Sequence, residues 1–588
     1  MTISIASKPS EIKSWYKNWR AEQVEKGHIR DTQSPTLLTT WYAERIIAGD
    51  IIACEDVIWA CKRHLNDLKR AGTDDFPYIF DEEKGHRPIR FIEKYCKPSK
   101  GNFYQLVMQP WQHFAIGSQY GWIHKDTGLR KYKEGLIFVP RKNGKTTKIG
   151  GLSTYAVSKD GERGARVYVL ANAKQQAREL YDEARAMVKA SPALNKRMKE
   201  TGLAITYPAT NSKIEPRASD SKKLDGLNTS FAVFDEIHEF KNYKLINVIK
   251  RSWSARKQPL LEYITTAGYE LDGPLVDFIE IGKDVIRGAM DQERKFYLMY
   301  TMDDIKEIEN PELWVKSNPN IGVTLDLPSL IEDYNADKNN PGEHADWITK
   351  QFNIFADNDE LSFINYETLL RNDKEIDISE LAGRECIGGY DLSNTEDFTS
   401  ACLEFPLDDG RVAVITHTWV PGKKAREDDS IPYDEYQKRG LLTICDTEYV
   451  DYGLVEQWFI EMSKIYNIQK IAYDRHNAYR LNQALEAYGF ELVEVRQGYM
   501  TLNAPMKDLK QILIDGKLIF NKNKMLRWYI NNVKLVMDRN GNWMPTKQSK
   551  YRKIDGFAAL LNAHTLVMEM MAKPVGSGTI KFVSFKKK

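Results

Sequence analysis

The chain has 588 residues, of which 28% are charged and 42% are hydrophobic. One hydrophobic core rarely serves so long a chain, so we expect two large domains plus an appendage. The net charge of +2 excludes a strongly basic field over the whole molecule, so any nucleic-acid binding must rely on local patches.

The six cysteines are scattered along the chain, which favours a reducing, intracellular setting over a disulfide framework. Cys54 and Cys61 lie seven residues apart in a predicted amphipathic helix, a spacing that suits packing better than zinc binding. No apolar run reaches the ~18–20 residues of a membrane span, and residues 1–10 lack the core of a signal peptide. We therefore expect a soluble protein with no membrane partner.

Residues 1–85 repeat apolar side chains at helical spacing and predict an N-terminal helical extension. Its basic helix face would either contact DNA or, as is more usual for such faces, be solvated; that face carries Lys62, Arg63, Lys69 and Arg70.

Residues 86–356 alternate apolar strands with helices, which predicts a parallel sheet covered on both faces. The expected strands are 136–139, 166–171, 231–236 and 260–267. Ligands of such sheets bind at the carboxyl ends of the strands.

A phosphate-binding loop follows the first of these strands. Its residues are Arg141, Lys142, Asn143, Gly144, Lys145, Thr146 and Thr147, and a helix begins after Gly144. A helix N-terminus favours anions, Lys145 can reach the β- and γ-phosphates, and Thr146 can hold Mg²⁺. Val139 replaces the usual first glycine. The pattern predicts an ASCE-like P-loop NTPase domain that binds ATP with Mg²⁺.

Asp235 and Glu236 end the strand at 231–234 and would emerge beside this loop. Asp235 is predicted to hold Mg²⁺ together with Thr146, and Glu236 to polarise the attacking water. The alternative is that one of them only caps a helix starting near Ile237.

Other side chains could complete the ATP site. Gln112 could pair with an adenine edge or be an ordinary surface glutamine. Thr265 and Thr266 end the next strand, where they could sense the γ-phosphate or simply terminate the strand. The candidates for an arginine supplied by a neighbouring subunit are Arg217, Arg251 and Arg256.

A polar linker at 357–382 precedes a second strand pattern at 383–572, and residues 573–588 form a basic tail. Three successive strands joined in part by a hairpin, then strand–helix alternation, then a final helix at 554–571 follow the order of ribonuclease-H-like folds. The fold class is therefore α/β, with an ATPase domain followed by a ribonuclease-H-like nuclease domain.

Three aspartates occupy matching places in this second pattern. Asp391 and Asp474 end strands and Asp555 begins the last helix, where such a fold brings them together. Two divalent metals (Mg²⁺ or Mn²⁺) ~3.5–4 Å apart would offset their repulsion and support phosphodiester cleavage. Asp397 is a further possible ligand, and His476 could assist. Each aspartate taken singly is more often a cap.

Basic residues near these aspartates would attract DNA phosphates: Arg475, Arg480, Arg496, Lys547, Lys550, Arg552 and Lys553. A hairpin is predicted at 533–546. Its Trp543 could stack on a base, although packing against the hairpin is the better interpretation.

These motifs together resemble the large terminase subunit of tailed bacteriophages, the DNA-packaging ATPase and nuclease. The resemblance rests on Pro110–Gln112, Arg141–Thr146, Phe234–Glu236, Thr265–Gly268, Asn318–Asn320, Tyr390–Ser393, Tyr473–Arg475, Arg496–Gly498 and Lys553–Gly556. It implies that Thr265 and Thr266 couple hydrolysis to movement, and that Glu236, Asp391, Asp474 and Asp555 are catalytic.

The resemblance also implies partners and a location. They are double-stranded DNA, a small terminase subunit and the portal protein of the procapsid, with a homo-oligomeric, pentameric ring during packaging. The setting would be the host cytoplasm and not the mature virion. Two alternative hypotheses remain when the residues alone are considered. One is a helicase–nuclease of DNA repair or restriction, and the other is a catalytically silent scaffold that binds nucleotide and DNA.

Overall fold

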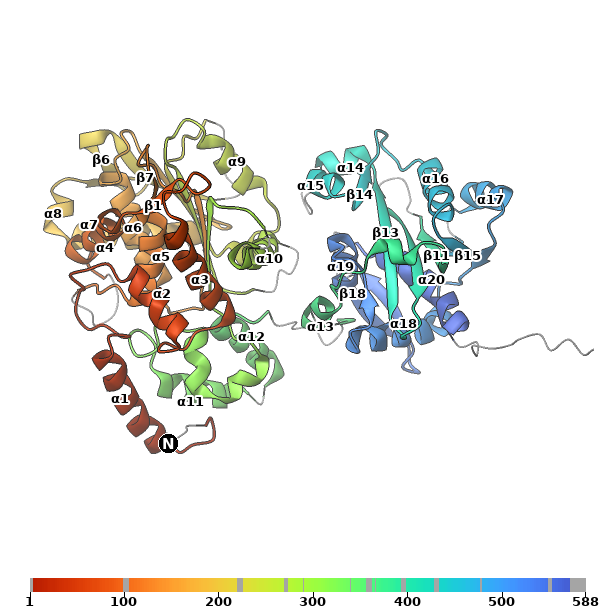
Figure 1. Cartoon of the computed structure of the whole chain (residues 1–588), viewed down its shortest axis with the longest axis horizontal. Helices are drawn as coiled ribbons and strands as arrows, with labels where there is room; N and C mark the ends of the chain where they lie inside the picture. The colour runs from red at the N-terminus through yellow and green to blue at the C-terminus, as the bar shows by residue number, and fades with distance from the viewer. Residues whose placement is uncertain are drawn as a thin grey trace, which may run out of the picture. The chain divides into compact units, whose positions relative to one another are not determined.

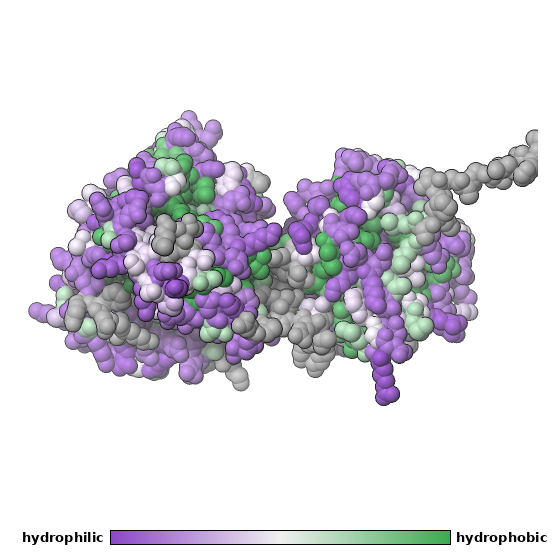
Figure 2. Space-filling view, turned by 90° about the horizontal axis from the view of Figure 1, so that it is seen from below, coloured by the Kyte–Doolittle hydropathy of each residue, from purple (hydrophilic) through white to green (hydrophobic). Residues whose placement is uncertain are grey.

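The computed structural model describes residues 4–98, 105–218, 226–268, 273–288, 290–338, 340–355, 362–364, 366–392, 398–427, 433–475, 478–547 and 553–571. The chain forms two compact units, residues 1–358 and 359–588, which we describe separately. No helix in these ranges is long and apolar enough to cross a membrane. The face of each unit seen in Figure 2 is mainly hydrophilic, with smaller apolar patches.

The first unit is built on an eight-stranded sheet. Its order is β10 (Lys295–Met299), β3 (Glu134–Phe138), β9 (Leu260–Thr265), β8 (Phe231–Asp235), β4 (Arg166–Ala171), β7 (Ser212–Ala218), β6 (Ile205–Tyr207) and β5 (Lys199–Glu200). The pairs from β10 to β7 are parallel. Because β9 lies between the strands that lead to the phosphate loop and to Asp235, the sheet has the predicted ASCE order. Strands β10 and β7 and the antiparallel extension by β6 and β5 were not predicted.

Helices cover both faces of this sheet, because its apolar strands must be shielded from water. They are α2 (Thr39–Ala48), α3 (Glu55–Arg70), α4 (Glu82–Tyr95), α5 (Pro110–Gly121), α6 (Lys145–Ser158), α7 (Lys174–Ala190), α8 (Pro192–Asn195), α9 (Lys244–Ser252) and α10 (Pro274–Arg287). A two-stranded sheet pairs β1 (Tyr78–Phe80) with β2 (Trp122–His124). Buried residues from α2 to α4 belong to the same core as the sheet, so this helical extension packs as part of the unit.

The basic face of α3 is partly turned inward. Arg63 donates to the carbonyl of Lys295 at 2.8 Å, and Arg70 forms ion pairs with Asp67 and Glu293. Arg63 therefore holds α3 to its own unit, whereas Lys69 and Arg70 are exposed, as on a solvated face.

A segment after β10 forms a smaller core of its own. It contains two short 3-10 helices (Ile305–Glu309 and Pro311–Lys316), α11 (Leu327–Asp337) and α12 (Pro341–Phe352). The fully buried Trp314 lies at its centre. The N-terminal helix α1 (Pro9–Glu25) packs beside α11 (Figure 1). The first helix of this unit thus packs against the segment that ends the unit.

The second unit contains a seven-stranded sheet. Its order is β14 (Leu442–Ile444), β13 (Val412–Val420), β12 (Thr399–Pro406), β11 (Glu385–Asp391), β15 (Asn467–Tyr473) and β16 (Leu492–Glu494), with β17 (Leu518–Ile519) against β13. Strands β11 to β13 are antiparallel, whereas β15 and β16 run parallel to β11. The ribonuclease-H-like order, with β11 beside β15, is confirmed.

The remaining elements surround this sheet. The helices are α13 (Tyr366–Arg371), α14 (Gly422–Glu427), α15 (Tyr433–Lys438), α16 (Tyr452–Ser463), α17 (Tyr479–Tyr488), α18 (Tyr499–Ile514), α19 (Lys524–Asn531) and α20 (Asp555–Met571), with a short 3-10 helix at Ile378–Leu381. The predicted hairpin pairs β18 (Val533–Met537) with β19 (Trp543–Lys547). Trp543 lies under two lysine ammonium groups of α18, those of Lys507 and Lys510.

A buried ionic cluster joins three elements of this unit. His564 of α20 contacts Glu404 of β12 through Nδ1 at 2.7 Å and Asp508 of α18 through Nε2 at 3.0 Å. Burial alone lowers the pKa of His564, but the two carboxylates outweigh it and raise this pKa to about 9. The imidazolium form is therefore the one that fits the fold.

The second unit should lose stability between pH 7 and 9.5. A folded-state pKa raised above the ordinary ~6.5 contributes stability that is complete below that value and is lost as the pH rises through about 9. We expect protection of the α20 amides in hydrogen exchange, corrected for intrinsic rates, to fall over this range in the wild type, and to fall less in His564→Gln.

His417→Gln is the matched control for this experiment. His417 is a half-buried histidine of β13 whose pKa is lowered to about 4 by desolvation, so it stays neutral over this range. Its substitution should leave the slope with pH unchanged. An equal slope in the wild type and in His564→Gln would contradict the role of the His564 charge.

Candidate active sites

The phosphate loop lies between the carboxyl end of β3 and the first turn of α6. Gly144 and Lys142 both have positive φ, 78° and 63°, which turns the chain sharply before the helix. Lys145 is buried and donates from Nζ to the carbonyl of Val139 at 2.9 Å. The Thr146 side chain is exposed. A helix N-terminus, a lysine and an accessible hydroxyl together suit a nucleotide phosphate with its metal ion.

Glu236 sits at the centre of the contacts between β8, β9 and this loop. Its carboxylate lies 3.7 Å from Lys145 Nζ. It accepts a hydrogen bond from the backbone N–H of Thr266 at 3.2 Å. The residue has φ 48°, and its side chain makes no capping bond to the short 3-10 helix Ile237–Glu239. The capping alternative is therefore wrong for Glu236.

The two neighbouring acids have opposite electrostatic environments. Burial, followed by repulsion from Glu236, raises the pKa of Asp235. Burial also acts to raise the pKa of Glu236, but Lys145 and His238 outweigh it and hold this pKa below its usual value. Glu236 thus stays ionised, as a residue that orients water requires.

A network of asparagines, whose contacts with one another were not predicted, fixes the loop. Asn143 donates from Nδ2 to Asn318 Oδ1 at 2.9 Å, and accepts on Oδ1 from the backbone N–H of Asn320 at 3.1 Å. Asn320 donates from Nδ2 to the carbonyl of Asn143 at 3.2 Å and accepts from Trp111 Nε1 at 2.7 Å. All three asparagine side chains are buried. The segment after β10 therefore supports the phosphate loop directly.

Asn320→Ala should weaken ATP binding and destabilise the first unit. The change leaves Trp111 Nε1 and the carbonyl of Asn143 without these partners, at a cost of about 1–3 kcal/mol for each buried group. We expect a lower melting temperature and a several-fold weaker affinity in a titration with a fluorescent ATP analogue. Asn335→Ala is the control, because Asn335 of α11 donates to the carbonyl of Ile5 and accepts from the ammonium of Lys338, and neither partner belongs to the phosphate loop. Equal affinities of the two variants would contradict the proposed support.

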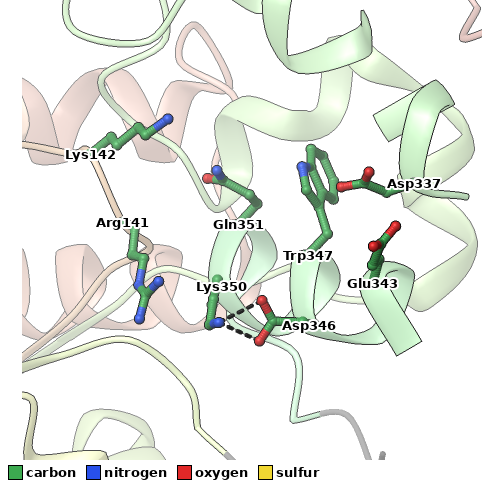
Figure 3. Close-up of a pocket in the computed structure, with 8 residues that line it drawn as sticks. All are labelled: Arg141, Lys142, Asp337, Glu343, Asp346, Trp347, Lys350 and Gln351. Carbon is green, nitrogen blue, oxygen red and sulfur yellow. Dashed lines mark hydrogen bonds and ion pairs between the residues drawn. The ribbon is translucent and has the colours of Figure 1, made fainter. Parts of the chain in front are cut away.

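A cleft of about 540 Å³ opens beside the loop. Figure 3 shows Arg141 and Lys142 on one side, and side chains from the end of α11 and from α12 on the other. That second wall consists of Asp337, Glu343, Asp346, Trp347, Lys350 and Gln351. The cleft thus pairs a basic wall with a mainly acidic one.

Gln112 lies behind the loop and is buried, so the surface alternative is wrong. Its Oε1 accepts from the backbone N–H of Gln109 at 2.9 Å, and its Nε2 is close to Gly144. Pairing with adenine remains a prediction.

Of the arginines suggested for action in trans, Arg256 is held within its own unit. Its guanidinium pairs with Glu162 at 3.1 Å and donates to the carbonyl of Gly164 at 2.8 Å, near the amino ends of the strands. This places Arg256 at the sheet edge away from the phosphate loop. Arg217 pairs with Glu215 at 3.5 Å, and Arg251 is exposed on α9.

In the second unit, strand pairing brings two of the acids to one place. Tyr390 pairs with Tyr473 in the parallel register of β11 and β15, so the next residues, Asp391 and Asp474, leave neighbouring strands at the same level. Side chains alternate between the faces of a strand. Since Gly389 faces α20, Asp391 is on the face that α20 covers.

The direction of α20 places the third acid at the same end. His564 contacts Glu404, which pairs with Ile387, and Ala559 lies against Gly389. The helix therefore runs antiparallel to β11, and its first residue, Asp555, reaches the level of Asp391.

A tyrosine links Asp555 to the strand ends. Burial and Asp555 both raise the pKa of Tyr529, and the Tyr529 hydroxyl lies 3.4 Å from Ser400 Oγ. Ser400 is the register partner of Asp391. Asp555 thus lies near β12, the strand whose Ser400 pairs with Asp391.

The side chains of Asp391, Asp474 and Asp555 do not form a preformed metal site in this structure. Among the residues that the structure describes, no group of three or more His, Cys, Asp or Glu side chains is arranged to hold a metal ion. The strand register and the direction of α20, rather than contacts between the side chains, support the prediction that these three aspartates share one site. Asp397 and His476 lie outside the described residues, as do Lys550 and Arg552.

Comparison with known proteins agrees with the two predicted domains. Residues 110–284 match the family model "Terminase large subunit, ATPase domain", and residues 289–570 match "Terminase large subunit, endonuclease domain". The terminase large subunit of Lactococcus phage SK1 is 24% identical over 513 residues, covering 84% of this chain and 92% of that protein. Protein YmfN of Escherichia coli K12 is 28% identical over 352 residues, covering 58% and 77%.

Among solved structures, the large terminase of bacteriophage HK97 superposes with a TM-score of 0.47 and 21% identity over 82% of this chain and 99% of that one. The two family matches together span most of the chain and contain every residue predicted for the ATP and nuclease sites. The chain therefore belongs to the terminase large-subunit family and is an ATPase and endonuclease of the viral DNA-packaging motor.

Proposed function

We propose that Lys145, Thr146, Asp235 and Glu236 form the ATPase centre of this motor. The observation that carries this assignment is the position of the Glu236 carboxylate between Lys145 of the phosphate loop and the N–H of Thr266, the residue after β9. When bound, Mg²⁺ would supply charge neutralisation at the phosphates, with Thr146 and Asp235 as the residues to hold it. Glu236 orients the attacking water, and Thr265 and Thr266 link that step to the sheet.

The cleft of Figure 3 supports a location for the nucleotide. Phosphates belong on the side of Arg141 and Lys142, because the carboxylates of the opposite wall would repel them. Those carboxylates accept hydrogen bonds and suit ribose hydroxyls instead. The volume of about 540 Å³ is within the range of small-ligand sites.

The endonuclease centre is proposed at Asp391, Asp474 and Asp555, with Asp397 as a possible further ligand. Carboxylate oxygens are the ligands that Mg²⁺ and Mn²⁺ prefer. A pair of such ions bound there would lower the pKa of a bound water, so that it can act as the nucleophile, and would offset the charge of the cleaved phosphate. The carboxylates fix the ions, and nearby basic residues such as Arg475 and Arg496, both exposed, attract the DNA backbone.

The partners of this motor are proposed from the family. They are double-stranded DNA, a small terminase subunit that selects it, and the portal of a procapsid, with a pentameric ring during packaging in the host cytoplasm. Both family matches favour this reading over a helicase–nuclease.

The test is an assay of the purified chain for ATP hydrolysis, with and without double-stranded DNA, and for plasmid cutting, with and without EDTA. DNA should stimulate hydrolysis, and EDTA should stop both reactions. Uptake of DNA by procapsids only when ATP, small subunit and portal are all present would support the motor. Cutting that persists in EDTA would contradict the metal-dependent centre.

A further inference from the structure

One side chain contacts both the acid proposed to orient water and the threonine proposed to couple hydrolysis to movement. His238 Nδ1 lies 3.1 Å from Glu236 Oε2 and 2.9 Å from Thr265 Oγ1. Its own backbone N–H donates to the same Thr265 oxygen at 3.2 Å. Most of its side chain is shielded from solvent, with 13% exposed.

The hydrogen-bond network fixes where the proton of His238 sits. Thr265 has one hydroxyl proton, which it donates to the carbonyl of Thr266 at 2.8 Å in preference to Glu236 at 3.5 Å. Thr265 Oγ1 therefore accepts from His238. Because a carboxylate also only accepts, Nδ1 must carry a hydrogen that points at both oxygens.

The position of the imidazole ring is fixed from behind. A Cβ atom added at Gly268 would lie 2.4 Å from His238 Cδ2, so only a glycine there leaves room for the ring. Gly268 follows the threonine pair by two residues. The turn after β9 thus packs against the ring, and the ring cannot swing away from Glu236 without moving this turn.

We propose that His238 is a positioning residue that ties the direction of the Glu236 carboxylate to the end of β9. Glu236 Oε2 also accepts from the Thr266 N–H at 3.2 Å, and Oε1 faces Lys145 only at 3.7 Å, so a second donor at Oε2 would restrain the direction of the carboxylate. His238 supplies that restraint through the same atom that contacts Thr265. A shift of Thr265 therefore changes the direction of Glu236, and hydrolysis becomes sensitive to the coupling strand. The proposal rests on the assigned role of Glu236.

Three substitutions test this proposal in the full-length chain. His238→Asn places an amide N–H near the position of Nδ1, whereas His238→Gln places one near Nε2, and His238→Ala removes both. We expect kcat of ATP hydrolysis to fall on the order of 10- to 100-fold in His238→Ala, the scale of a catalytic group that is misplaced by about 1 Å. The KM for ATP should stay unchanged. His238→Asn should restore kcat and His238→Gln should not.

Plasmid cutting by the second unit and nucleotide affinity serve as checks that each variant is folded. Wild-type kcat in His238→Ala, or equal losses in the Asn and Gln variants, would overturn the proposal. Glu236→Gln, assayed in parallel, separates the two failures: hydrolysis retained in that variant removes the role of Glu236 itself, whatever happens at His238.

Discussion

Glu236→Gln should abolish ATP hydrolysis while leaving ATP binding nearly intact. Glutamine has almost the same shape and keeps an oxygen that can accept from the Thr266 N–H, so the site geometry is preserved. It lacks the negative charge that faces Lys145 at 3.7 Å and that would orient water. General-base contributions of this kind are typically 10²–10⁴-fold in rate. The measurement is steady-state phosphate release beside a nucleotide titration.

The matched control is Glu239→Gln, because Glu239 lies three residues away on the exposed side of the same short helix. It loses the same charge at an exposed side chain whose repulsion is only a minor contribution to the raised pKa of Asp235. We expect its turnover to equal that of the wild type. Retained hydrolysis in Glu236→Gln would require another residue to orient the water.

Asp474→Ala should abolish Mg²⁺- or Mn²⁺-dependent cutting of plasmid DNA and spare ATP hydrolysis. The substitution removes one of three carboxylates proposed to hold the metals, and metal catalysis contributes several kcal/mol, so cutting should slow by at least about a hundredfold. ATP hydrolysis should persist because Asp474 belongs to the second unit, which has its own cores. Nicking of supercoiled plasmid and phosphate release, measured on one preparation, report the two activities.

Asp446→Ala is the control for loss of an acidic side chain in the same unit. Asp446 is exposed and follows β14, which is separated from β15 by three strands. Its removal should leave cutting unchanged. If Asp474→Ala cuts at the rate of the wild type, the proposed three-acid centre is refuted.

Regular patterns allowed half of the strands of the first sheet, and most of those of the second, to be predicted. The strand at 166–171 was predicted with the bounds of β4, and the final helix began one residue earlier than α20. These elements have long apolar runs or clear helical periodicity, and burial follows directly from such patterns. The neighbouring positions of Asp391 and Asp474 followed from fold order alone and agree with the strand register.

Short polar contacts between distant segments could not be predicted in this way. Asn143 and Asn320 are 177 residues apart, and no periodicity connects them. Asn353 is a similar case, since its side chain accepts from the N–H of Ala267 and donates to the carbonyl of Tyr300. Such contacts depend on the packing of the segment after β10 against the phosphate loop. A propensity signal was available only at Asn353, whose φ of 56° is one that asparagine tolerates better than most residues.

Interpretations of single charged residues were the least dependable. Arg63, Arg70 and Arg256 all looked available to a partner, yet each binds within its own unit. Arginine has five donors on a long side chain, so its partner is set by tertiary structure rather than by local sequence. His238 shows the converse, because its contacts to Glu236 and Thr265 appear only once β8 and β9 are side by side.

The most direct test of the two-site account is Mn²⁺ binding to the second unit within the full-length chain, measured by isothermal titration in the absence of nucleotide. We expect the wild type to bind two Mn²⁺ ions per chain. Binding should be lost in each of the variants Asp391→Ala, Asp474→Ala and Asp555→Ala, and it should be retained in Asp446→Ala. Wild-type binding in any one of the three aspartate variants would contradict a centre shared by these carboxylates.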